Sequence, residues 1–150
     1  MDLKRRSLMQ MTSLVSLMAC AGLLTEAQAM AWNQSAFAAK SLDDVTKALG
    51  GDTPQKSGAI VLRAPDIAEN SAVVSISIET ALKATELALL VEKNPNTLAA
   101  IFTIPKGTEA FASTRIKMSE SSNVYALARV EGRWLMAVKE VKVTIGACGV

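Results

Sequence analysis

Cys148 is the residue of this chain whose type and position are best suited to chemistry. The only other cysteine is Cys20, and the chain contains no histidine. Without histidine there is no serine–histidine triad, no cysteine–histidine dyad, no His-ligated zinc and no haem with an axial histidine. Two cysteines cannot supply four thiolates, so we expect no cofactor or metal of the chain's own. Asp66, Glu79 and Glu86 are candidate acid–base groups, but we expect them in turns or on solvent-facing positions.

Cys148 lies in a C-terminal segment of small residues that follows the last predicted strand. Glycine adopts either sign of φ, and chain ends move unless they are held. We therefore predict a flexible arm over residues 146–150, in which Gly146, Ala147, Gly149 and Val150 give Cys148 its freedom. Five extended residues span roughly 16–18 Å, which is enough to carry a thiol into the active site of another protein.

The surroundings of Cys148 suit a carrier better than a catalyst. No Lys or Arg lies within three residues of Cys148, and the carboxylate of Val150 favours the protonated thiol. A thiol with no base beside it can hold a group that other proteins transform, as carrier arms do. Two alternatives remain open: a buried cysteine, which we would expect on a strand, and a cysteine that only forms intermolecular disulfides.

Residues 1–29 have the pattern of an export signal. Lys4, Arg5 and Arg6 precede an apolar stretch, and Ala27-Gln28-Ala29 is a small-x-small cleavage site. The Arg5-Arg6 pair favours the twin-arginine route over ordinary secretion, and therefore a periplasmic product. Cleavage after Ala31 fits almost as well as cleavage after Ala29.

The apolar part of this signal also bears on membrane attachment. It is shorter than the roughly 20 apolar residues of a spanning helix, so we expect no membrane insertion. The segment Leu17-Met18-Ala19-Cys20 resembles a lipoprotein cleavage box, which would make Cys20 a lipid anchor. We favour a soluble product, because the apolar run continues past Cys20 to Leu24 and the cleavage site follows it.

The remaining chain has the patterning of one domain, residues 30–145. Residues 32–49 show helical spacing, with Ala38, Leu42, Val45 and Leu49 on one face and Ser41 and Asp44 as a capping pair, and Gly50-Gly51 ends the helical pattern. Trp32 and Phe37 should pack this segment onto the domain. The predicted strands are Ala59–Leu62, Val73–Glu79, Glu86–Glu92, Ala99–Ile104, Phe111–Met118, Val124–Val130 and Trp134–Ile145.

These strands predict the fold class. Turn residues separate them at regular intervals, and no helix is expected between them. This is typical of an all-β, immunoglobulin-like antiparallel β-sandwich, here with a short N-terminal helical segment and a flexible C-terminal cysteine arm. Residues 80–85 stay unassigned, as a loop or an irregular strand end. The net charge of +2 is too balanced for a nucleic-acid-binding protein.

Several segments of the chain together resemble the SoxY family, the cysteine-bearing subunits of the SoxYZ sulfur carrier of thiosulfate oxidation. The export signal with Arg5-Arg6 is similar too, and the likeness covers essentially all of the chain after that signal. The segments that carry the resemblance are Trp32-Asn33, Ala48–Gly51, Ala64–Asn70, Val91–Pro95, Ser113–Met118 and Lys139–Ile145.

The resemblance implies a carrier without catalytic activity that pairs with SoxZ. It implies that Cys148 is the point of covalent sulfur attachment and that Gly146 and Gly149 are hinges of the arm. It also implies transient partner enzymes: the haem enzyme SoxAX, which conjugates thiosulfate to the cysteine, and the hydrolase SoxB, which releases sulfate. The remaining sulfur is then either oxidised by a molybdenum–haem enzyme or passed elsewhere. The alternative from another class is a non-catalytic periplasmic β-sandwich interaction module whose cysteine only forms intermolecular disulfides.

The chain departs from the family pattern at two positions of the arm. SoxY proteins end in Gly-Gly-Cys-Gly-Gly, whereas this chain has Ala147 before the cysteine and Val150 at the end. Alanine restricts φ, and valine adds bulk and a stiff χ1 near the thiol. We therefore expect these residues to affect which partner enzymes accept the arm.

Overall fold

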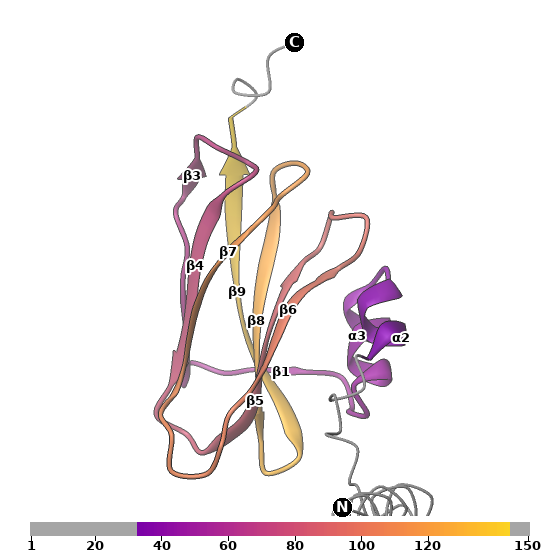
Figure 1. Cartoon of the computed structure of the whole chain (residues 1–150), viewed down its shortest axis with the longest axis vertical. Coiled ribbons are helices and arrows are strands. Elements are labelled where there is room, and N and C mark those ends of the chain that lie inside the picture. Colours follow the sequence, from indigo (N-terminus) through magenta and orange to yellow (C-terminus); the bar gives the residue numbers. More distant parts are fainter. Residues whose placement is uncertain (1–32, 145–150) are drawn as a thin grey trace, which may run out of the picture. The chain divides into compact units, whose positions relative to one another are not determined.

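The computed structural model describes residues 33–144, which form two short helices and nine strands (Figure 1). Six strands make the large sheet, in the order β1-β9-β8-β5-β6, with β3 also paired to β9. Three strands make the small sheet, in the order β2-β4-β7. The elements are α2 (Gln34–Ala38), α3 (Leu42–Ala48), β1 (Gln55–Lys56), β2 (Ile60–Arg63), β3 (Ile67–Ala68), β4 (Val74–Thr80), β5 (Ala84–Val91), β6 (Leu98–Thr103), β7 (Ala110–Ile116), β8 (Ser122–Val130) and β9 (Arg133–Val143).

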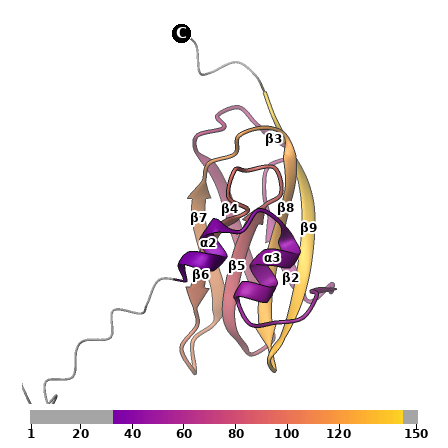
Figure 2. The same cartoon turned by 90° about the vertical axis from the view of Figure 1, so that its right-hand side faces the viewer.

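The predicted all-β sandwich is confirmed, and the strand patterns explain its layers. In β4, the alternating Val74, Ile76 and Ile78 are buried between the sheets, and the residues between them are more exposed. In contrast, β5 is apolar without alternation, and Leu87–Val91 is fully buried. Both faces of β5 are covered, one by the small sheet and the other by the helices (Figures 1 and 2).

The helical segment contains two helices instead of one continuous pattern. Ala39 has an extended backbone and ends α2, and the side chain of Ser41 accepts a hydrogen bond from the Asp44 amide to begin α3. This break turns Ala38 to solvent, contrary to the expectation that it shares one buried face with Val45. Phe37 packs against the buried cluster under the helices as expected, whereas Trp32 lies outside the described residues.

Two short strands that the sequence did not indicate, β1 and β3, pair in parallel with β9. Neither has a two-residue alternation long enough to be recognised, since each contains only two residues. Residues 80–85 contain the end of β4, a tight connection and the start of β5. Among residues 33–144, no helix is long and apolar enough to cross a membrane.

Candidate functional site

The predicted attachment site, Cys148, and its neighbours Gly146, Ala147, Gly149 and Val150 lie outside the described residues, as do Arg5 and Arg6 of the predicted export signal. The structure does describe the strand from which the arm continues. That strand is β9, whose last residue is Val143 and which Thr144 follows.

The backbone amides at the end of β9 donate hydrogen bonds on both sides of the strand. On one side, the Lys142 amide donates to the Asp66 carbonyl at 3.0 Å, and the Thr144 amide donates to the Ala68 carbonyl at 3.1 Å. On the other side, the Val143 amide donates to the Ser121 hydroxyl at 2.9 Å. The chain is therefore held in position up to Thr144, two residues before the start of the predicted arm at residue 146.

Lys139 adds a charged contact to the same strand. Its Nζ donates to the Ala64 carbonyl and forms an ion pair with Asp66 Oδ1 at 2.9 Å. The carboxylate of Asp66 is largely exposed, so this ion pair contributes at most about 1 kcal/mol. Its structural effect is to bring the segment before β3 onto β9, which the two-residue strand β3 would hold only weakly by itself.

Asn94 connects two loops near the end of β9. Its Nδ2 donates to the Lys117 carbonyl at 2.7 Å, and its Oδ1 accepts from the Ser119 amide at 2.9 Å. The Met118 amide donates to the Ser71 carbonyl at 2.8 Å, which joins a third loop to the group. The end of the sandwich at which β9 finishes is therefore cross-linked by hydrogen bonds between its loops. Nothing in the local sequence pattern indicates this role of Asn94, because its two partners lie more than twenty residues away.

The three carboxylates considered as acid–base groups have separate structural roles. Glu79 pairs with Arg63 at 3.3 Å on the small sheet, and Glu86 pairs with Arg129 at 2.9 Å on the large sheet. Asp66 pairs with Lys139, as described above. The structure does not bring these carboxylates together, in agreement with the expectation that they are surface or turn residues. Within residues 33–144, no three His, Cys, Asp or Glu side chains are grouped as metal ligands.

Arg129 joins the helices to the large sheet, a role that the sequence did not indicate. Besides Glu86, its guanidinium donates to the Gly50 carbonyl at 2.8 Å and lies 5.3 Å from the centroid of the Trp134 ring. Adjacent to it, Gly51 packs directly against Trp134. The Gly50-Gly51 pair could have suggested this close approach, because a glycine pair after a helix allows a neighbouring ring to contact the backbone.

Tyr125 is the only side chain of the described region whose pKa is clearly shifted. Burial raises the pKa of Tyr125 above its ordinary value of 10.0, and the nearby Glu92 carboxylate raises it further. The side chain packs against the cluster beneath the helices. Its phenol therefore remains neutral at physiological pH and contributes packing instead of a reactive phenolate.

Comparisons with known proteins agree with this arrangement. The chain is similar to the protein described as the sulfur carrier protein SoxY from Chlorobium limicola f thiosulfatophilum, with 34% identity over 70% of this chain and 97% of that chain, and a TM-score of 0.63. A comparison with curated protein sequences found no match. The family model described as sulfur oxidation protein SoxY matches residues 45–148, a range that includes Cys148. The chain therefore belongs to the SoxY family of sulfur-oxidation carrier proteins.

Proposed function

We propose that the chain is a periplasmic covalent carrier that holds thiosulfate-derived sulfur on Cys148 and presents it to other enzymes. The observation that carries this proposal is the family match, which extends from the sandwich to Cys148. The rigid end of β9 supports it, because a carrier arm needs a fixed point from which to move. The predicted twin-arginine signal, Arg5-Arg6, supports export of the folded chain together with a SoxZ partner.

The chemistry that we propose for Cys148 needs no catalytic group on this chain. Joining thiosulfate to the thiol forms an S–S bond and releases one proton and two electrons, which a haem enzyme of the SoxAX type accepts. Hydrolysis by a SoxB-type enzyme then releases sulfate and leaves a persulfide on Cys148. A molybdenum–haem enzyme is the proposed oxidant of this remaining sulfur. The carrier contributes tethering, which replaces repeated diffusional encounters with transfers from one bound site.

Intact-mass measurement of the chain purified from thiosulfate-grown cells tests the proposal. We expect adducts of sulfur or thiosulfonate that reductant removes and that map to Cys148. The alternative, an interaction module whose cysteine only cross-links, predicts a disulfide-linked dimer and no such adducts. If the mass is unmodified, reverting Val150 to the family's glycine tests whether the bulky terminus blocks loading.

Replacement of the thiol separates its role from folding. We expect Cys148→Ser to abolish sulfur loading while leaving the thermal unfolding midpoint and SoxZ binding unchanged, because residue 148 follows the last strand of the sandwich. The measurements are intact mass, thermal denaturation and co-purification with SoxZ. Loss of the fold in this variant would show that Cys148 is a structural residue and would contradict the proposal.

A further inference from the structure

The two outer faces of the sandwich differ in what covers them. Helices α2 and α3 pack on the outer face of the large sheet, over Ala88, Leu90 and Leu127 (Figures 1 and 2). Within residues 33–144, no helix lies over the outer face of the small sheet β2-β4-β7. We call this surface the open face; its residues are Val61, Arg63, Ser75, Ser77, Glu79, Phe111, Ser113 and Arg115.

One end of the open face carries two exposed apolar side chains. Val61 and Phe111 flank Glu79 in one cross-strand row, since Glu79 is the register partner of both residues. Phe111 is 51% exposed and Val61 is 40% exposed. A groove of about 500 Å³ lies beside Phe111 and includes Leu82, which is also exposed. An exposed aromatic with aliphatic neighbours is the type of anchor that buries well in a protein interface.

The middle of the open face consists of small side chains with hydroxyl groups. Ser77 is the register partner of both Arg63 and Ser113, and Ser75 lies two residues before it on β4. Together with Arg63, these serines line a depression of about 270 Å³. Their hydroxyls have no hydrogen-bond partner within residues 33–144. They therefore allow close approach and offer unused donors to a partner surface.

The other end of the open face is cationic. Arg115 is the register partner of Ser75, and Lys117 follows directly after β7. Neither side chain has an ion-pair partner in the part of the chain that the structure describes, whereas Arg63 is paired with Glu79. The open face has two cations, Arg63 and Arg115, and one anion, Glu79; Lys117 beside it adds a third cation, so this end of the surface is positively charged. A second copy of the chain would bring like charges together, so an acidic partner surface is favoured.

We propose that the open face binds the SoxZ-type subunit through carboxylates that meet Arg115 and Lys117 and an apolar surface that covers Phe111 and Val61. This inference rests on the SoxZ partnership proposed above. A lasting partner must leave the arm accessible to enzymes, and the end of β9 belongs to the other sheet. The open face meets this requirement, because it lies on the small sheet and not on the sheet that contains β9.

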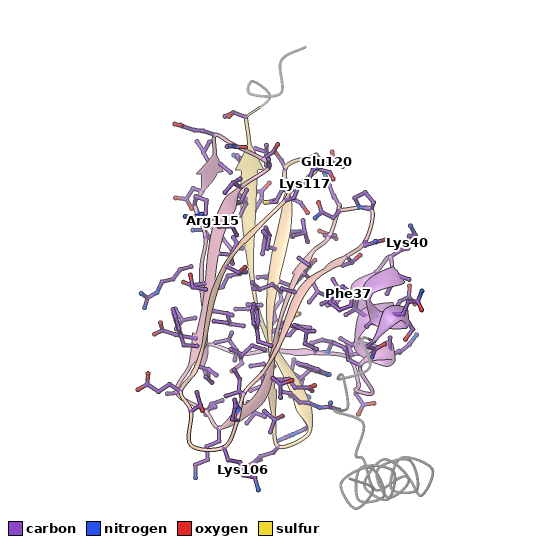
Figure 3. All side chains as sticks on the ribbon, viewed as in Figure 1. Phe37, Lys40, Lys106, Arg115, Lys117 and Glu120 are labelled. Atoms are coloured by element: carbon purple, nitrogen blue, oxygen red, sulfur yellow. The ribbon has the colours of Figure 1, made fainter. Side chains whose placement is uncertain are left out.

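Charge reversal and removal of the anchor test the proposal. We expect Arg115→Glu with Lys117→Glu, and separately Phe111→Ser, to raise the Kd for purified cognate SoxZ at least about tenfold. The charge control is Lys40→Glu, since Lys40 lies on the helix side of the molecule, away from Arg115 (Figure 3). The apolar control is Val138→Ser, an exposed residue of β9 on the large sheet. Both controls should leave the Kd within twofold.

Titration calorimetry of SoxZ into each full-length variant, at two salt concentrations, gives the readout. Binding by the unaltered chain should weaken with salt, and the charge-reversed variant should lose most of that dependence. An unaltered chain that does not bind SoxZ would contradict the proposed partnership itself. Binding that persists unchanged in both open-face variants would overturn only this inference. The inference would also be overturned if the unaltered chain self-associates and the same substitutions convert it to a monomer, because the open face would then bind a second copy of the chain.

Discussion

Gly51 is the glycine of residues 33–144 that is most tightly packed against a neighbouring side chain. A Cβ built at this position would lie 2.2 Å from Trp134 Cδ1 and 2.4 Å from Trp134 Nε1. Trp134 is only 2% exposed, so its ring cannot move aside without disturbing the cluster around it. The indole Nε1 has no hydrogen-bond partner within residues 33–144. Trp134 is therefore positioned against Gly51 by packing of the ring and not by a hydrogen bond.

We therefore expect Gly51→Ala to lower the free energy of unfolding by about 1–3 kcal/mol through overpacking. Gly58→Ala is the matched control, because a Cβ there would meet nothing within 4 Å. The control should change stability by less than about 0.5 kcal/mol, apart from the small gain that comes from restricting the unfolded chain. Urea unfolding of both variants gives the comparison, and equal midpoints would show that Trp134 accommodates the added methyl group.

Two connections between strands, near the end of β9, are held together by the side chain of Asn94. Asn94 satisfies both the Lys117 carbonyl and the Ser119 amide, and so holds the β5–β6 and β7–β8 connections together. We expect Asn94→Ala to lower the free energy of unfolding by about 1–2 kcal/mol, with faster hydrogen exchange at the Ser119 amide.

Asn96→Ala is the control for this substitution, since Asn96 lies in the same connection and its exposed side chain has no hydrogen bond to the described residues. The control should leave exchange at Ser119 unchanged. Similar acceleration in both variants would mean that the composition of the turn, and not the Asn94 bridge, orders these loops.

The elements that sequence reasoning predicted are those whose pattern extends over many residues. The alternation in β4 and the length of the apolar run in β5 each indicate a strand by themselves. The strands β1 and β3 were not predictable, because their pairing with β9 depends on contacts such as Lys139 with Asp66 that no local pattern reports. The break between α2 and α3 does not show in the spacing of the apolar residues, which continues across Ser41 although Ser41 caps the start of α3.

The candidate site also has one part that the sequence indicates and another part that only the fold shows. Cys148 can be proposed from the sequence alone, because the expected chemistry needs only one residue type. The contacts around the end of β9, from which the proposed arm would continue, come from three loops far apart in the sequence, and only the fold brings them together. The open face is similar, since Arg63, Ser77 and Ser113 become neighbours only through strand register.

The molecule as a whole is built around the large sheet, which two apolar clusters share within residues 33–144. The cluster between the sheets contains seventeen buried residues, and the cluster beneath the helices contains seven. Leu89 and Leu90 are adjacent on β5 and both fully buried, but Leu89 belongs to the first cluster and Leu90 to the second. Replacing each with alanine therefore compares the two clusters with the same chemical change.

We expect Leu89→Ala and Leu90→Ala each to cost about 2–5 kcal/mol of unfolding free energy. Because the second cluster is smaller and α2 and α3 are short, Leu90→Ala should also open the helical layer locally. Native-state hydrogen exchange would then show the Val45 and Leu49 amides of this layer accelerated more than the β4 amides in Leu90→Ala. Leu89→Ala should accelerate both groups equally, through global unfolding. Equal acceleration in Leu90→Ala as well would mean that the helices and the sandwich unfold as one cooperative unit, with the Arg129 contacts coupling the two layers.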